Sequence, residues 1–157
     1  MKTIVVISDT HGNRQLLDKL DPIFAENDYV IHLGDTSADG NYIRMKHPEK
    51  TYVINGNCDP VNLGENEKVI SVEGVKIFAC HGHRYSVKSN LYKLAEKAKS
   101  LGCGIALYGH THKAFETEID GVTLLNPGAG KKYSENSYLY IVINGEKAVF
   151  KTVTVQV

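Results

Sequence analysis

The sequence predicts an α/β protein built from two packed β-sheets with helices on their outer faces. Short runs rich in β-branched residues recur along the chain, and apolar residues repeat with helical period between the first two of these runs. Later in the chain, turn-forming pairs join neighbouring runs in the way that hairpins do. Because the helical patterns come early and the hairpins come late, two packed sheets are favoured over one doubly wound sheet.

The strand-like runs cover residues 3–7, 29–33, 51–54, 75–79 and 105–108, and each stops at a turn-prone or polar residue. Between the first two, 13–27 carries the helical repeat, which predicts a β-α-β unit. Two further helices are expected. One covers 41–46, with Pro48 just beyond it, and a longer one covers 88–101, with Gly102 as the residue that ends it.

Two turns predict hairpins. Glu73-Gly74 lies between the halves of 69–79, and Asn144-Gly145 lies in a strand-rich tail made of 123–125, 138–143 and 148–157. The tail ends with alternating valines, which predicts a C-terminal edge strand with one buried face. Such an edge could pair with a second copy of the chain, and the sequence leaves the oligomeric state open. These valines are Val149, Val153, Val155 and Val157.

Composition limits the classes of function. A chain of 157 residues with 42% hydrophobic residues fits a single domain over 1–157. Eighteen basic residues balance eighteen acidic ones, which argues against capture of long nucleic acid or an anionic membrane and favours a small substrate. Three cysteines without CxxC spacing are expected to be free thiols in a reducing compartment. With no signal-peptide pattern and no apolar run of membrane-spanning length, the expected location is the cytoplasm.

Polar clusters follow five of the predicted strands. If these strands share one sheet, their ends meet at one edge, where α/β folds bind ligands. Side chains two apart on an extended strand end point the same way, so Asp9 with His11, and His110 with His112, are expected to face one point. The clusters are Ser8-Asp9-Thr10-His11-Gly12, Gly34-Asp35, Asn55-Gly56-Asn57-Cys58-Asp59, Cys80-His81-Gly82-His83 and Gly109-His110-Thr111-His112.

These residue types suit a pair of divalent ions. Two such ions bring four positive charges, and Asp9, Asp35 and a bridging hydroxide bring three negative ones, which leaves about one positive charge to attract a phosphate. Each motif alone has an ordinary structural explanation, such as a capped turn. However, five of the seven histidines fall in the clusters, and only His32 and His47 are assigned to structure.

Together the motifs resemble the calcineurin-like metallophosphoesterase superfamily, and in particular its small bacterial and archaeal phosphodiesterases. The ordered series DxH, GD, GNxD, GH and GHxH appears from Asp9 to His112. The resemblance implies a four-layer α/β/β/α sandwich of two mixed sheets, and two divalent ions with Mn²⁺ as first choice and Ni²⁺, Co²⁺, Fe, Zn²⁺ or Mg²⁺ as alternatives. It places Asp9, His11 and His112 on one ion, Asn57, His81 and His110 on the other, and Asp35 between them.

Asp35, Asn57, Cys58, Asp59 and His83 are the residues expected to act in catalysis. Cys58 stands where much of the superfamily has histidine, and a neutral thiol is a weak proton donor, so either a reduced rate with poor leaving groups or simple space filling fits it. His83 fits a phosphate contact or a hydrogen bond to a ligand, and Asp59 fits orientation of a ligand better than ligation. Arg84, Tyr85 and Lys88 follow directly; one of them could hold a phosphate, although a solvated basic face is the commoner explanation.

The predicted activity is therefore hydrolysis of phosphodiester bonds in small substrates by a metal-bridging hydroxide. Two other classes of function remain open. Retromer-type relatives of this fold resemble it and serve protein assembly, but they have lost several ligands that are all present here. Repair nucleases share the motif series, but they normally carry extra domains and basic surfaces, which this neutral chain lacks.

Overall fold

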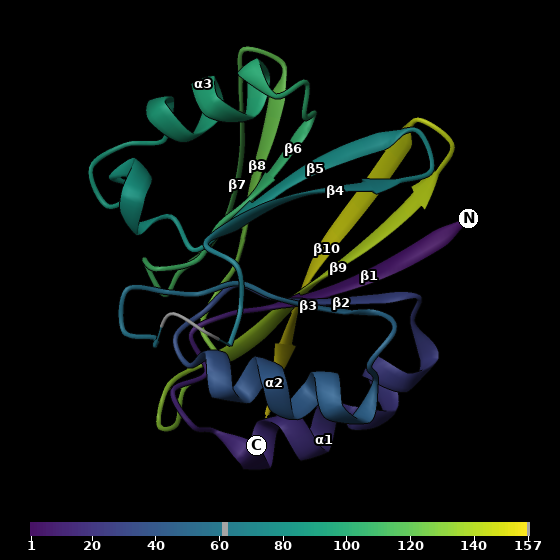
Figure 1. Ribbon diagram of the computed structural model, residues 1–157, viewed down its shortest axis with the longest axis vertical. Helices are drawn as coiled ribbons and strands as arrows, with labels where there is room; N and C mark the ends of the chain where they lie inside the picture. Colours follow the sequence, from purple (N-terminus) through teal and green to yellow (C-terminus); the bar gives the residue numbers. More distant parts are fainter. Residues whose placement is uncertain (61–62, 157) are drawn as a thin grey trace.

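A computed structural model of the chain describes residues 1–60 and 63–156, and it has the expected four layers, helix, sheet, sheet and helix (Figure 1). One sheet has the strand order β10-β9-β1-β2-β3, and the other has the order β4-β5-β6-β8-β7. Both sheets mix parallel and antiparallel pairs. The fold class predicted from the sequence is thus confirmed.

The first sheet is built on a parallel core with an antiparallel hairpin at one edge. β1 pairs in parallel with β2, which pairs in parallel with β3, while β9 runs antiparallel to both β1 and β10. The bounds are β1 Lys2–Ile7, β2 Tyr29–His32, β3 Thr51–Val53, β9 Asn136–Asn144 and β10 Lys147–Val155.

The second sheet has a parallel centre of three strands between two antiparallel edges. β5, β6 and β8 run parallel, and β4 and β7 are the edge strands. The bounds are β4 Glu67–Val72, β5 Val75–Cys80, β6 Ile105–Leu107, β7 Ala114–Ile119 and β8 Val122–Pro127.

Helices α1 (Arg14–Glu26) and α2 (Ser37–Lys46) cover the first sheet, and α3 (Tyr92–Ser100) covers the second (Figure 1). A short 3-10 helix, η1 (His83–Tyr85), follows β5. Three apolar clusters result: one between the sheets, one under α1 and α2, and one under α3. Each fully buried Leu, Ile or Phe contributes about 1.5–3 kcal/mol, so these layers hold the strand ends in fixed positions. Among the described residues, no helix has the length and apolar character needed to span a membrane.

Two helix boundaries differ from the prediction. Helix α2 begins at Ser37, four residues before the expected 41–46, because the Asp59 carboxylate accepts a hydrogen bond from the Ser37 N–H at 2.8 Å. Helix α3 begins at Tyr92 rather than at 88, because Ser86 has a left-handed φ of 54° and Asn90 accepts from the Tyr92 N–H. Both helices are therefore set by backbone conformations and a remote carboxylate that periodicity does not report.

The hairpins at Glu73-Gly74 and Asn144-Gly145 are confirmed as β4–β5 and β9–β10. Strand β7 was not predicted, because it is polar and largely exposed. The Asp120-Gly121 pair, with φ of 50° and 82°, is the hairpin signal that could have found it.

The C-terminal strand, β10, lies at a sheet edge as predicted. Its expected buried face is only partly present: Val153 and Val155 pack against the cluster under α1, but Val149 is 65% exposed. The last of the four alternating valines, Val157, lies outside the described residues.

Candidate metal centre

The polar clusters meet, but they come from two sheets rather than one. Those after β1, β2 and β3 belong to the first sheet, and those after β5 and β6 belong to the second. The prediction of a single sheet edge was therefore wrong. Backbone hydrogen bonds fix the loops to one another: the Asp9 N–H donates to Gly34 O at 2.9 Å, and the Gly109 N–H donates to His81 O at 2.9 Å.

The proposed ligands do not sit on extended strand ends. Asp9, His11, Asp35, His110 and His112 all have left-handed backbones, with φ between 43° and 69°. Side chains two apart therefore converge through turns and not through the pleat of a strand, contrary to the expectation from the sequence. A non-glycine residue in this region costs about 1–3 kcal/mol, and such strain concentrates at functional sites where the surroundings enforce it.

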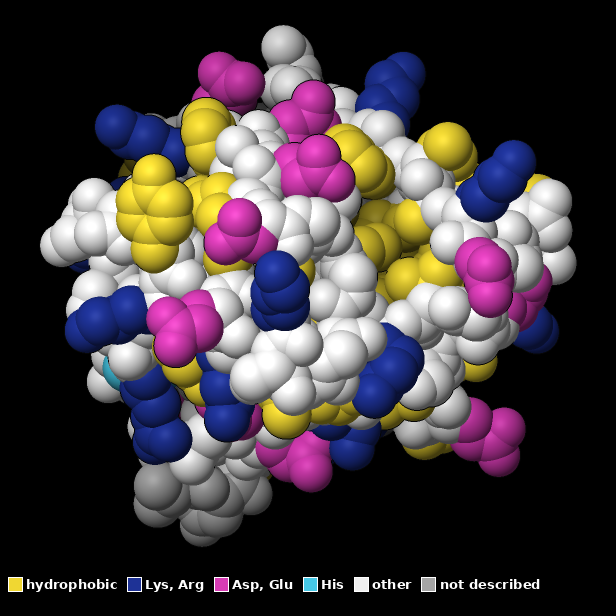
Figure 2. Space-filling view, turned by 90° about the horizontal axis from the view of Figure 1, so that it is seen from above, with side chains coloured by type: hydrophobic (Ala, Val, Ile, Leu, Met, Phe, Trp, Pro, Cys, Tyr) yellow, Lys and Arg dark blue, Asp and Glu magenta, His cyan; other side chains and the backbone are white. Residues whose placement is uncertain are grey.

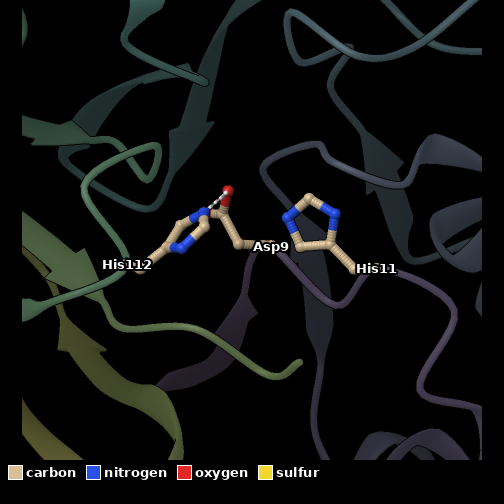
Figure 3. A group of neighbouring side chains, drawn as sticks. All are labelled: Asp9, His11 and His112. Atoms are coloured by element: carbon tan, nitrogen blue, oxygen red, sulfur yellow. Dashed lines mark ion pairs between the residues drawn. The ribbon is translucent and has the colours of Figure 1, made fainter. Parts of the chain in front are cut away.

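Asp9, at 0% exposure, is the centre of the cluster. Its Oδ2 accepts from the Ser8 hydroxyl at 2.6 Å and from the His110 N–H at 3.0 Å, which fixes the carboxylate. The other oxygen, Oδ1, lies 3.2 Å from His112 Nε2. Figure 3 shows the rings of His11 and His112 on either side of Asp9. One potential ligand atom from each of the three residues lies within 4.8 Å of the others. These three residues form one group able to hold a divalent ion.

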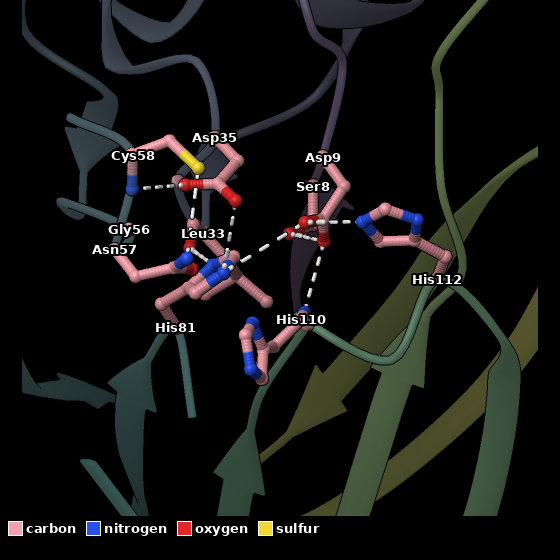
Figure 4. Close-up of polar contacts among 12 residues, drawn as sticks. Ser8, Asp9, Leu33, Asp35, Gly56, Asn57, Cys58, His81, His110 and His112 are labelled. Atoms are coloured by element: carbon pink, nitrogen blue, oxygen red, sulfur yellow. Dashed lines mark hydrogen bonds and ion pairs between the residues drawn. The ribbon is translucent and has the colours of Figure 1, made fainter. Parts of the chain in front are cut away.

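A second group shares Asp9 and adds Asp35 and His81, again within 4.8 Å of one another (Figure 4). His81 Nε2 lies 3.4 Å from Asp35 Oδ2 and 3.8 Å from Asp9 Oδ1. In this structure the residue common to both groups is Asp9, whereas the sequence analysis placed Asp35 between the ions. The two groups are thus adjacent and share a buried carboxylate.

The hydrogen bonds around His81 test whether a cation fits. Its Nδ1 lies 2.8 Å from Leu33 O, and a carbonyl can only accept, so Nδ1 carries the proton of the neutral ring. The lone pair of Nε2 then faces two carboxylates, and both His81 Nε2 and Asp9 Oδ1 are buried without a hydrogen-bond partner. Neighbouring lone pairs and negative charges repel unless a cation lies between them. The donor set therefore fits divalent ions.

The electrostatics without a cation point the same way. Burial lowers the pKa of His81, but the close contact with Asp35 and the charges of Asp9 and Asp35 outweigh it and raise the pKa. Burial also raises the pKa of Asp35, yet contact with His81 and the Cys58 N–H lower it more. The site thus favours positive charge next to ionised carboxylates, which a divalent ion supplies more strongly than a proton.

The remaining two predicted ligands border these groups. The His110 ring lies 5.0 Å, centroid to centroid, from the His81 ring, and burial lowers the pKa of His110, which favours the neutral ring that a metal requires. Asn57 is exposed, and its Nδ2 donates to Cys58 Sγ at 3.5 Å. His110 belongs to neither of the two groups above.

Asp59 uses both carboxylate oxygens on backbone groups. Oδ2 accepts from the N–H groups of Asp35 at 2.9 Å and Gly56 at 2.7 Å, and Oδ1 accepts from Ser37. Asp59 therefore holds the loop that carries Asp35. These contacts are those expected of a residue that orients a ligand rather than binding an ion itself. Gly56 is required there, because a Cβ on it would lie 2.1 Å from Asp35 Oδ1.

His83 and Cys58 flank the cluster. The His83 ring lies 5.5 Å from the His81 ring and 6.1 Å from the His110 ring, and its Nδ1 is buried without a partner. The Cys58 N–H donates to Asp35 Oδ1 at 3.1 Å, and the charge of Asp35 with some burial raises the pKa of the thiol. The thiol is thus neutral at neutral pH.

Of Arg84, Tyr85 and Lys88, Tyr85 has a structural partner, because its hydroxyl donates to Glu67 on β4. Arg84 and Lys88 are exposed. The charge of Lys88 contributes to lowering the pKa of both His110 and His112, after burial, so this ammonium lies near the centre.

Sequence reasoning missed a buried polar network below the centre. The Gly34 N–H donates to His32 Nδ1 at 3.1 Å, His32 Nε2 lies 2.9 Å from Thr10 Oγ1, and the Thr10 hydroxyl donates to Asp39 Oδ2 at 2.6 Å. Asp39 also accepts from the Gly12 N–H at 2.8 Å. His32 is structural, as predicted, and it joins the loop of Asp9 to that of Asp35. The signal available in the sequence was Thr10, a polar residue between the proposed ligands Asp9 and His11.

Comparisons with known proteins agree with this site. The Calcineurin-like phosphoesterase superfamily domain matches residues 1–147. The chain is 31% identical to a probable metallophosphoesterase of Bacillus subtilis over 80% of the chain and 73% of that protein, and 25% identical to a phosphodiesterase of Methanocaldococcus jannaschii over 98% and 99%.

Solved structures show the same fold. A predicted phosphoesterase of Streptococcus pneumoniae superposes with a TM-score of 0.83 at 26% identity, covering 98% of this chain and 89% of that one. Vps29 of Entamoeba histolytica, solved in complex with zinc, gives 0.77 at 23% identity, covering 97% and 98%. On the match over residues 1–147, the chain belongs to the calcineurin-like phosphoesterase superfamily.

Proposed function

We propose that this chain is a phosphodiesterase that uses two divalent ions, with Mn²⁺ as first choice, to hydrolyse small substrates. One observation carries the proposal: Asp9 Oδ1 and His81 Nε2 are buried, lack hydrogen-bond partners, and belong to two adjacent donor groups. Family membership and the phosphodiesterase among the relatives support the reaction class.

The residues divide between two ion positions. Asp9, His11 and His112 would hold one ion, and Asp35 with His81 the other, with His110 and Asn57 as further ligands at its border. Ions bound there would activate a water molecule and neutralise the charge that develops on the phosphoryl oxygens. No side chain is then needed as the nucleophile.

The chain's own residues orient the groups and move the proton. Ser8 and the His110 N–H fix Asp9, and Asp59 fixes the loop of Asp35. His83, whose ring lies 5.5 Å from that of His81, would donate a hydrogen bond to a phosphoryl oxygen or to the leaving oxygen.

Surface charge supports a small substrate. Figure 2 shows one face of the molecule on which Lys and Arg side chains alternate with Asp and Glu, without a broad basic stripe. The net charge of zero gives no long-range attraction for nucleic acid. The three free thiols at Cys58, Cys80 and Cys103 fit a reducing compartment such as the cytoplasm.

The test is metal reconstitution. Protein stripped with a chelator is titrated with Mn²⁺, Ni²⁺, Co²⁺, Zn²⁺ and Mg²⁺, and calorimetry counts the ions bound while rates are measured on bis(4-nitrophenyl) phosphate, a cyclic nucleotide and a single-stranded oligonucleotide. Two ions per chain and hydrolysis of the small diesters are expected. Asp9→Asn should remove both, whereas Asp120→Asn, on an exposed turn, should change neither.

The other possible results would favour a different class of function. Ion binding without hydrolysis of any diester would contradict the enzyme and favour a binding scaffold of the same fold. Faster cleavage of the oligonucleotide than of the small diesters would favour a nuclease.

A further inference from the structure

A cavity opens beside the turn that carries His110 and His112. It has a volume of about 390 Å³, within the range of about 300–1,000 Å³ that small-ligand sites have. Its walls are mainly apolar, with Leu91, Tyr108 and Phe115 among them, and two lysines also line it. The polar lining residues are Lys88, Thr111 and Lys113.

The cavity lies beside the proposed metal centre, because the turn that carries His110 and His112 forms part of its wall. Thr111 lies between His110 and His112 in the chain, and it lines the cavity. Its position is fixed, because its hydroxyl accepts from Asn126 Nδ2 at 3.0 Å and its N–H donates to Gly109 O at 2.8 Å. A substrate with its phosphodiester at the metal centre can therefore extend one of its organic groups along this turn into the cavity.

The lining defines the chemistry of that group. Phe115 lines the cavity and is 55% exposed, so its ring is accessible for a planar group to stack on. Lys88 and Lys113 are both exposed. Within residues 1–60 and 63–156, neither ammonium group has a carboxylate partner within 4.0 Å. Two unneutralised ammonium groups at an apolar wall match a planar group that carries a doubly charged anion.

We infer that this cavity binds the terminally phosphorylated nucleoside of a short linear dinucleotide, with the base against Phe115 and the terminal phosphate between Lys88 and Lys113. The inference rests on the proposed phosphodiesterase function and names its substrate class. In the reaction, the internal P–O ester bond breaks, water gives its hydroxyl to phosphorus and its other proton to the leaving oxygen, and the terminal phosphate is unchanged.

The experiment compares two substrates that differ only in that phosphate. With Mn²⁺-loaded enzyme, kcat/KM for a 5′-phosphorylated dinucleotide should exceed that for the same dinucleotide without the phosphate by about tenfold, the order expected for two exposed charge pairs. In the double variant K88Q/K113Q this ratio should fall to about one. The matched control Lys147→Gln, an exposed lysine on β10, should keep the wild-type ratio. Thermal unfolding checks that each variant is folded.

A ratio near one in the wild type, or the same ratio in the double variant, would overturn the inference even if bis(4-nitrophenyl) phosphate is hydrolysed normally. If no diester is hydrolysed with any metal, the proposed function fails instead. Equilibrium binding of the phosphorylated dinucleotide then decides the cavity separately: tighter binding to the wild type than to K88Q/K113Q supports the site, and equal binding rejects it.

Discussion

His32 offers a quantitative test of how the network below the metal centre contributes to stability. The ring is fully buried, its Nδ1 accepts from the Gly34 N–H, and its Nε2 faces Thr10, whose own proton goes to Asp39. These contacts require a neutral ring, with the proton on Nε2. Burial is the main reason that the pKa of His32 falls from 6.5 to about 4, and the charges of Asp39 and Asp9 only partly oppose it.

The sign follows from proton linkage. In the unfolded chain the imidazole takes up a proton below pH 6.5, whereas in the folded protein it stays neutral down to about pH 4. The stabilisation by neutral His32 is therefore complete above 6.5 and is lost as the pH falls toward 4. At about 1.4 kcal/mol per pH unit, the total loss is about 3 kcal/mol.

The perturbation is His32→Gln, which removes the titrating group. The Gln amide can still donate toward Thr10, but it leaves the Gly34 N–H without its acceptor, so we expect a loss of about 1–3 kcal/mol at pH 7. Because the chain has no Trp, urea unfolding is followed by circular dichroism between pH 4 and 8 in the presence of a chelator. On acidification the stability of the wild type relative to the variant should fall by about 3 kcal/mol, so that its advantage at pH 7 disappears or reverses.

Thr10→Val is the matched control. It removes the hydroxyl below the ring but keeps the imidazole, so its stability should run parallel to that of the wild type across the whole pH range. If the curve of His32→Gln also runs parallel to the wild type, His32 does not stay neutral in the fold, and the reasoning is refuted.

Three further predictions concern the centre itself. Gly109→Ala places a Cβ 2.6 Å from Asp9 Oδ2, so calorimetry should show weaker Mn²⁺ binding and unfolding should show a loss of about 1–3 kcal/mol, whereas Gly104→Ala, with open space around it, should be neutral. Cys58→His replaces a neutral thiol by an imidazole, which is a better proton donor. The rate of cleavage should rise on the order of tenfold more for diesters with poor leaving groups than for activated aryl diesters, and equal rate changes would refute a role in proton donation. Asp59→Asn removes a charged acceptor from three backbone N–H groups and should lower stability by about 1–3 kcal/mol while its protein still binds two ions; a lost ion would mean that Asp59 is a ligand.

The sequence predicted the fold class and gathered the polar clusters because both depend on local signals. Apolar periodicity identifies the core faces of strands and of α1, and short motifs name residues such as Asp9 and His81 directly. Strand β7 escaped because nearly all of its side chains face solvent, so burial imposes no pattern on it. The start of α2 escaped because it depends on Asp59, twenty-two residues further along the chain.

The geometry of the site could not be predicted for a related reason. The motif spacing was interpreted as alternation along a strand, whereas the structure uses left-handed turns at Asp9, His11 and His112. A turn of this kind is stable only when distant groups hold it, and here they do: the His110 N–H reaches back to Asp9 at 3.0 Å across one hundred residues of chain. Contacts of that range are invisible to local patterns.

The same contacts explain why polar residues that bind no ion occur within the metal motifs. A carboxylate such as Asp9 must be desolvated to face a cation closely, and its second oxygen must then be satisfied by protein donors, here the Ser8 hydroxyl and the His110 N–H. Position 109 is a glycine because a Cβ there would come within 2.2 Å of the Ser8 hydroxyl oxygen. Ser8 and Gly109 are thus required by the geometry of Asp9, even though neither offers a ligand. It follows that a substitution at Ser8 or Gly109 should weaken ion binding without removing a ligand atom. Such a variant would distinguish residues that orient Asp9 from residues that bind the ion.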